Sequence, residues 1–82
     1  MSNKLLRLPS VKAESGYSRS TIYLRIAQGL WTRPVSLGPR CVAWPAVEVA
    51  ALNAARIAGK GEADIRALVT RLQAARALAQ PV

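Results

Sequence analysis

The 82-residue sequence contains no histidine, one cysteine and only four acidic residues. The commonest metal ligand and the commonest general base are therefore both missing. The lone cysteine, Cys41, excludes an intrachain disulfide framework and is expected to be a small buried side chain. We expect no metal, no cofactor and no catalytic residue, so the protein is predicted not to be an enzyme.

Long apolar runs are missing as well. No stretch approaches the roughly 20 apolar residues of a membrane span, and residues 1–9 lack an apolar run of signal-peptide length. A reducing cytoplasm without membrane contact is therefore the expected location. Binding to a membrane surface is the weakest alternative, because the best amphipathic segment, from Glu62 onward, has no aromatic side chain.

Positive charge, in contrast, is abundant. Twelve Lys and Arg residues give a net charge of +8, which favours polyanions such as nucleic acid or acidic lipid. Between Lys4 and Arg40, seven cations accompany a single carboxylate, Glu14. We expect the contacts with the polyanion to lie in this part of the chain, within residues 10–44.

A helix, a tight turn and a second helix are predicted near the N-terminus. The first helix spans residues 9–15, with Ser10 as its N-cap and Val11 facing inward. Gly16 breaks this helix, because glycine is the residue that most readily leaves the helical conformation. Ser18 is the expected N-cap of the second helix.

The second helix is predicted over residues 19–28 and ends at Gly29. Ile22 and Ile26 lie four residues apart, so they share one face and are expected to point into the core. Side chains on the other face are left to solvent. The combination reads as a helix-turn-helix.

A β-hairpin is predicted next. Residues 35–37 and 41–44 alternate between apolar and polar side chains, and a Gly-Pro-Arg turn separates them. A hairpin after a helix-turn-helix is a wing, which reaches the DNA backbone or the minor groove while the second helix occupies the major groove. Two tryptophans flank the hairpin and are expected to anchor its core instead of stacking on bases, Trp31 and Trp44.

Helices are predicted in the rest of the chain. Pro45 suits the first position of a third helix that reaches Ile57. Its apolar stripe is expected at Val47, Ala50, Ala51 and Ala54. A last helix starts near Glu62 and Asp64, and its apolar stripe is expected at Ile65, Leu68, Val69, Leu72, Ala75 and Ala79, opposite Arg66, Thr70 and Gln73.

These elements predict a mainly α fold with a small β-hairpin, a winged helix-turn-helix followed by an amphipathic helix. Residues 1–58 form the expected DNA-binding domain and residues 59–82 a helical extension. The extension either packs back or pairs with a second subunit. Pairing is favoured because a short winged module reads only a few base pairs, so a homo-oligomer on DNA would supply specificity.

Double-stranded DNA is the expected partner, and the second helix is expected to carry most of the contacts. Arg19 is the first candidate, because it lies on the solvent side at the start of that helix. Arg40 is a long cation on a protruding turn. Tyr17 has two interpretations, a packing residue or a phosphate contact. The full set of expected DNA contacts is Lys12, Tyr17, Ser18, Arg19, Ser20, Thr21, Tyr23, Arg33 and Arg40.

The sequence also resembles a known family. The segments that carry the likeness are Val11-Lys12, Gly16 to Tyr23, Gly29 to Trp31, Pro34-Val35, Leu37-Gly38, Arg40, Trp44-Pro45 and Glu48-Val49. Over residues 5–58 the chain resembles the AlpA-type prophage regulators, which are similar to MerR-like winged helices and phage excisionases. Two positions depart from the family pattern, Thr32 and Leu24-Arg25, and the second weakens the case for Arg25 as a contact.

The resemblance implies a site-specific DNA binder of the bacterial cytoplasm, associated with the nucleoid. The leading hypothesis is a transcriptional regulator of a phage or integrated mobile element. The alternative is an excisionase, or recombination directionality factor, that bends attachment-site DNA and recruits an integrase. A hypothesis of another class is an adaptor that docks an integrase or RNA polymerase on its last helix.

Overall fold

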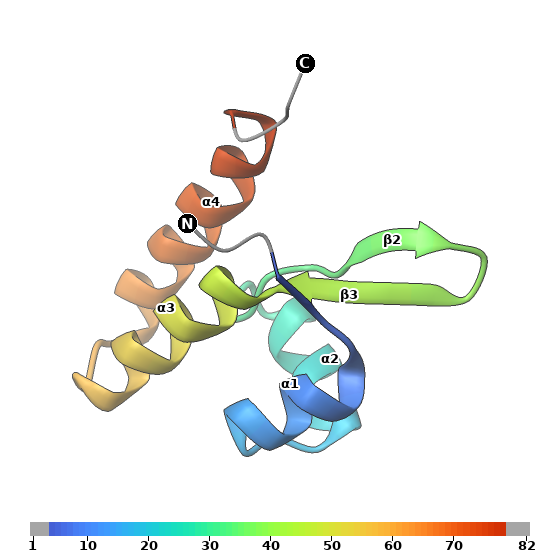
Figure 1. The fold of residues 1–82 in the computed structure, drawn as a ribbon. Coiled ribbons are helices and arrows are strands. Elements are labelled where there is room, and N and C mark those ends of the chain that lie inside the picture. Colours follow the sequence, from blue (N-terminus) through green and yellow to red (C-terminus); the bar gives the residue numbers. More distant parts are fainter. Residues whose placement is uncertain (1–3, 79–82) are drawn as a thin grey trace.

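The computed structural model describes residues 4–78, which form four helices and a small antiparallel sheet. The helices α1 and α2 lie below the sheet, the hairpin of β2 and β3 projects to one side, and α3 and α4 run along the other side (Figure 1). The mainly helical fold with a wing is the one that the sequence predicted. In chain order the elements are β1 (Leu5–Leu6), α1 (Leu8–Ser15), α2 (Arg19–Ala27), β2 (Val35–Gly38), β3 (Cys41–Pro45), α3 (Ala46–Ile57) and α4 (Glu62–Leu78).

The sheet contains a third strand that the sequence did not reveal. Its order is β1-β3-β2, so the hairpin strand β3 pairs with both neighbours. Leu6 lies opposite Trp44 in the first pair, and Val35 lies opposite Ala43 in the second. A two-residue strand is too short to show a periodic pattern, and it forms only because β3 offers a free edge.

The first helix begins earlier than expected. Ser10 was predicted as its N-cap, and this is wrong, because α1 starts at Leu8 and Arg7 occupies the cap position without a side-chain hydrogen bond. The chain leaves β1 in an extended conformation and turns directly into the helix, where Pro9 suits the first turn. Gly16 ends the helix with a φ of 76°, in the left-handed region that favours glycine.

The core lies where the first two helices, the wing base and the last two helices meet. Val11 and Ile22 are fully buried, as predicted. Both tryptophans belong to this core, which confirms their role as anchors, and the indole Nε1 of Trp44 donates to the carbonyl of Thr32 at 2.9 Å. Cys41, predicted to be buried, is only half-buried because it lies beside the turn of the wing, away from the core.

The predicted apolar stripe of α3 is mostly wrong, and only Ala51 of its four members is half-buried. Val47 is 48% exposed and Ile57 is 87% exposed, and Ala50 and Ala54 are exposed too. Pro45 ends β3 and precedes the helix as its N-cap instead of occupying its first turn. The larger side chains decide which face is buried, since burying more apolar area stabilises the fold more. The buried residues of α3 are Glu48, Val49 and Leu52.

Helix α4 packs against the same core. Ile65 and Val69 are 8% and 4% exposed, and the partly buried Leu68 and Leu72 pack beside them, which confirms most of the predicted stripe. Ala75 is exposed, and Ala79 lies outside the described residues. Within residues 4–78, no helix is both long and apolar enough to cross a bilayer.

Candidate nucleic-acid interface

The start of α2 is held by its own side chains. The backbone N–H of Thr21 donates to Ser18 Oγ at 3.3 Å, so Ser18 is the N-cap that the sequence predicted. The Ser18 hydroxyl in turn donates to Thr21 Oγ1 at 3.0 Å. These two predicted contact residues therefore order the first turn of the helix, whatever else they contact.

Arg19, Ser20 and Tyr23 lie on the solvent side of α2, as expected from the inward position of Ile22. The Arg19 guanidinium lies over the Tyr23 ring, 5.5 Å from its centroid. Tyr23 is 37% exposed, and its ring meets Trp44 edge to face at 6.3 Å. With Ser18, the three residues line an open hollow at the start of the helix.

The contact between Tyr23 and Trp44 joins this hollow to the wing, because Trp44 belongs to β3. The recognition face of α2 and the base of the wing are therefore neighbours. A cation held on an aromatic ring loses less side-chain freedom on binding than a free one does. Arg19 is thus presented toward solvent from an ordered platform.

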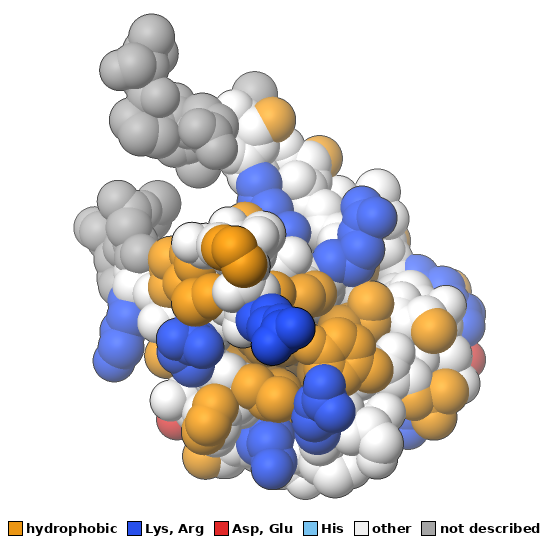
Figure 2. All heavy atoms as spheres, turned by 90° about the vertical axis from the view of Figure 1, so that its right-hand side faces the viewer, with side chains coloured by type: hydrophobic (Ala, Val, Ile, Leu, Met, Phe, Trp, Pro, Cys, Tyr) orange, Lys and Arg blue, Asp and Glu red, His pale blue; other side chains and the backbone are white. Residues whose placement is uncertain are grey.

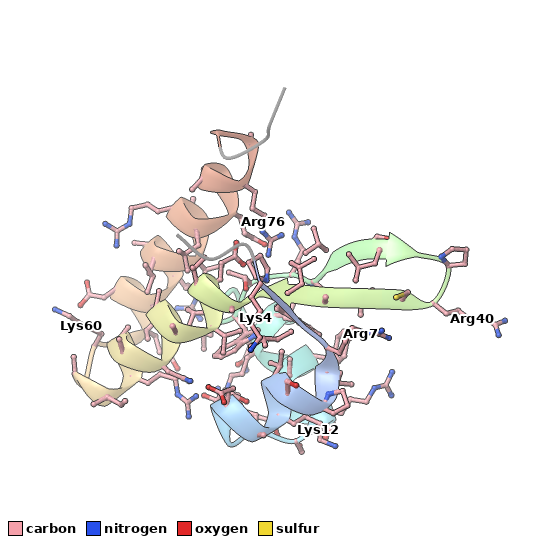
Figure 3. All side chains as sticks on the ribbon, viewed as in Figure 1. Lys4, Arg7, Lys12, Arg40, Lys60 and Arg76 are labelled. Atoms are coloured by element: carbon pink, nitrogen blue, oxygen red, sulfur yellow. The ribbon has the colours of Figure 1, made fainter. Side chains whose placement is uncertain are left out.

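Arg40 is at the tip of the wing, and its side chain points away from the rest of the molecule (Figure 3). It has a φ of 57° in the turn that joins β2 to β3. Arg7 and Lys12 also extend on the side toward which the wing projects, whereas Lys60 lies on the opposite side (Figure 3).

Figure 2 shows the side of the molecule from which the wing projects. On this face Lys and Arg side chains surround an apolar centre, and acidic side chains are seen only at the margins. Two of the four acidic side chains of the sequence are already paired. Glu48 binds Arg76, and Glu62 lies 3.7 Å from Arg66. The positive potential of this face is therefore little opposed by nearby carboxylates.

Tyr17 has different surroundings from the Arg19 hollow. Its half-buried ring meets Trp31 edge to face at 5.8 Å. The guanidinium of Arg56 lies 4.2 Å from the ring centroid, and that of Arg25 lies 5.8 Å from it. These contacts belong to packing, one of its two interpretations, while a phosphate contact by Tyr17 stays a prediction.

Arg33, another predicted contact, is tied to α4. Its backbone N–H donates to Gln73 Oε1 at 3.1 Å, and its side-chain Nε donates to the same oxygen at 3.3 Å. Arg76 NH2 donates to the backbone carbonyl of Arg33 at 2.6 Å. Gln73 was predicted on the face opposite the apolar stripe, and this is wrong, because it is half-buried on a flank of α4 that meets the chain just before the wing.

The pair of Glu48 and Arg76 was also missed. Arg76 Nε and NH2 donate to the two carboxylate oxygens of Glu48 at 2.8 and 2.6 Å. The Glu48 side chain is 4% exposed, so it is a buried carboxylate with a bidentate partner. No local pattern joins residues 28 positions apart in the chain. In the described part of the chain, His, Cys, Asp and Glu form no cluster suited to a metal ion.

The fold is that of a winged helix-turn-helix protein with a basic face beside its second helix and wing. The family described as "Prophage CP4-57 regulatory protein (AlpA)" matches residues 4–56, well over half of the chain. The chain belongs to this AlpA family of prophage regulatory proteins, in agreement with the resemblance seen in its sequence.

A relative from Enterobacteria phage P4, described as "Uncharacterized protein ORF88", is 49% identical over 57 residues. The aligned part covers 70% of this chain and 65% of the phage P4 protein, so the chain spans less than two thirds of that relative. No solved structure gave a significant match.

Proposed function

We propose that the chain is a sequence-specific DNA-binding regulator of transcription from a phage or integrated mobile element. Helix α2 enters the major groove, and the wing follows the backbone or the adjacent minor groove. The observation that carries the proposal is the ordered, exposed Arg19 beside Tyr23, which the Trp44 contact joins to the wing. Membership of a family of prophage regulatory proteins supports the regulatory role.

The predicted contacts divide by their geometry. Arg19 and Ser20, exposed at the start of α2, are suited to reading base edges. Arg40 at the wing tip and Lys12 on α1 are suited to phosphates, which fix the orientation of the protein without reading sequence. Ser18 and Thr21 hold the first turn of α2 in position and leave its free backbone N–H groups near the DNA.

Selection from random duplexes, followed by sequencing, tests this proposal. The Arg19→Ala variant should lose the motif that the wild type enriches but keep a salt-sensitive background affinity, with a cost of about 1–3 kcal/mol at the preferred site. Arg71→Ala is the matched control, because Arg71 is an exposed cation on α4 whose side chain makes no hydrogen bond to other described residues. Failure of the wild type to enrich any motif would overturn the proposal.

A promoter reporter in cells without an integrase tests the regulatory part. The wild type should change transcript levels there, and Arg19→Ala should not. A protein that leaves the reporter unchanged but switches an integrase from attachment to excision would instead be a recombination directionality factor. A protein whose activity survives Arg19→Ala in both assays would be an adaptor.

A further inference from the structure

Side chains of α4 form hydrogen bonds with the segment that joins the second helix to the wing. Residues 28–34 join the last turn of α2 to the start of β2. Arg66 Nε donates to the carbonyl of Gln28 at 2.9 Å, at the α2 end of the segment. Gln73 and Arg76 bind the backbone of Arg33 at the other end, as described above. Helix α4 thus contacts both ends of the connection.

The contact at the α2 end includes packing. Gly29 has a φ of 76°, and a Cβ built on it would lie 3.7 Å from Cγ of Arg66. The aliphatic stem of Arg66 therefore covers this glycine while its guanidinium binds Gln28. A Cβ at position 29 would make only ordinary van der Waals contact with Arg66, so the left-handed backbone alone favours glycine there.

The contact at the wing end is anchored to the rest of the protein. Arg76 binds the carbonyl of Arg33 and the buried carboxylate of Glu48 with the same guanidinium. Because Glu48 lies on the buried face of α3, the start of the wing is linked through Arg76 to that helix. Gln73 holds the Arg33 side chain through Nε as well as the backbone, so it orients a predicted DNA contact.

These contacts act on the connection between the second helix and the wing, at both of its ends. The backbone groups of Gln28 and Arg33 that α4 binds do not pair within the sheet, so without α4 they would be left to water. A hinge needs only a few connecting residues that change φ and ψ. Helix α4 lies beyond residues 4–56, so the family match does not account for it.

We propose that Arg66 and Gln73 are positioning residues, through which α4 fixes the wing relative to α2 and so sets DNA affinity. The inference rests on the proposed DNA-binding function. It also gives α4 a role within one subunit: this helix holds the DNA-binding part in its binding-competent form. If only a fraction of the molecules is in this form, the observed affinity for DNA falls in proportion to that fraction.

A matched pair of double variants tests the proposal. Arg66→Gln with Gln73→Ala removes the contacts of these two side chains with the connection and leaves the contact of Arg76 with Arg33. Thr70→Ala with Arg71→Gln is the control, because it also removes one cation and one polar group from α4, but Thr70 bonds only within its own helix and Arg71 is exposed. Arg76 is left in place, since its loss would leave Glu48 buried without a partner.

Two measurements are made on the full chain. Fluorescence anisotropy with the duplex selected by the wild type gives affinity, and residual dipolar couplings give the orientation of the β2–β3 hairpin relative to α2. The first double variant should bind about tenfold more weakly, because three hydrogen bonds that favour the competent form are lost. In this variant one alignment tensor should no longer fit both α2 and the hairpin, whereas the control should resemble the wild type in both measurements.

Equal affinity of the two double variants would overturn the proposal. An affinity loss with unchanged couplings would overturn it too, since Arg66 or Gln73 would then act at the DNA itself. A wild type that binds no duplex would refute the proposed function. In that case the couplings alone decide: a single tensor for the first variant overturns the positioning role, and two tensors support it.

Discussion

Arg40 combines an unusual backbone conformation with an exposed charge. Its φ of 57° lies in the left-handed region, where asparagine and glycine are the residues best tolerated. An arginine held there, at the tip of the wing, sacrifices local backbone stability. Its side chain makes no hydrogen bond or ion pair with the other residues in 4–78, which fits a group that serves a ligand.

Arg40→Asn should weaken DNA binding without lowering stability. Asparagine tolerates the turn but removes the cation, so the slope of log K against log salt should fall by about 0.9, the value for one phosphate contact. Salt titration of duplex affinity measures the slope, and urea unfolding measures stability. Arg40→Lys is the control, because it keeps the charge in the same strained turn. An unchanged slope for Arg40→Asn would exclude a phosphate contact at the tip.

At the scale of elements, the Glu48 and Arg76 pair joins α3 to α4. Glu48 is 4% exposed, while Arg76 is 24% exposed and bidentate. A buried carboxylate is costly unless it is paired, and the removal of one partner costs more than the replacement of both by apolar groups. The pair therefore explains why a glutamate occupies the buried face of an alanine-rich helix.

Arg76→Met should lower the free energy of unfolding by about 3–5 kcal/mol, because it leaves Glu48 buried without a counter-charge. Glu48→Leu combined with Arg76→Met should recover most of this loss. Urea unfolding of the single and double variants measures both values, and Arg71→Met serves as the control for losing a cation from α4. A double variant as unstable as the single one would show that the pair stabilises through the Arg33 contact instead.

At the scale of the whole molecule, the apolar stripe of α4 is occupied within the chain. Ile65 and Val69 lie in the core, so the side chains that favoured self-association from the sequence are used in packing. Association on DNA stays a prediction, based on the few base pairs that one winged module can read.

We expect a free protein that is monomeric and a DNA complex that holds at least two copies. Sedimentation velocity gives the mass of the free protein, and native mass spectrometry of the complex with the selected duplex gives the number of copies. Halving the duplex to a single half-site is the control, which should reduce the complex to one copy. One copy on the full site would contradict the prediction.

Much of the local structure and part of the candidate site were predictable from the sequence. Ser18 caps α2, Gly16 ends α1 and Ile22 faces inward, because each of these interactions acts within a few residues of the chain. The solvent position of Arg19 follows from the same helical period. The family likeness was visible for the same reason, since it is carried by short segments.

Only the tertiary structure decided which distant groups meet. The sequence pattern of α3 favoured Val47, yet the buried face contains Glu48, which Arg76 neutralises from 28 positions away. Strand β1 forms only against β3, and Gln73 meets Arg33 across 40 positions. Such contacts depend on how the elements are placed relative to one another, and the local periodicities of the chain carry no information on that placement.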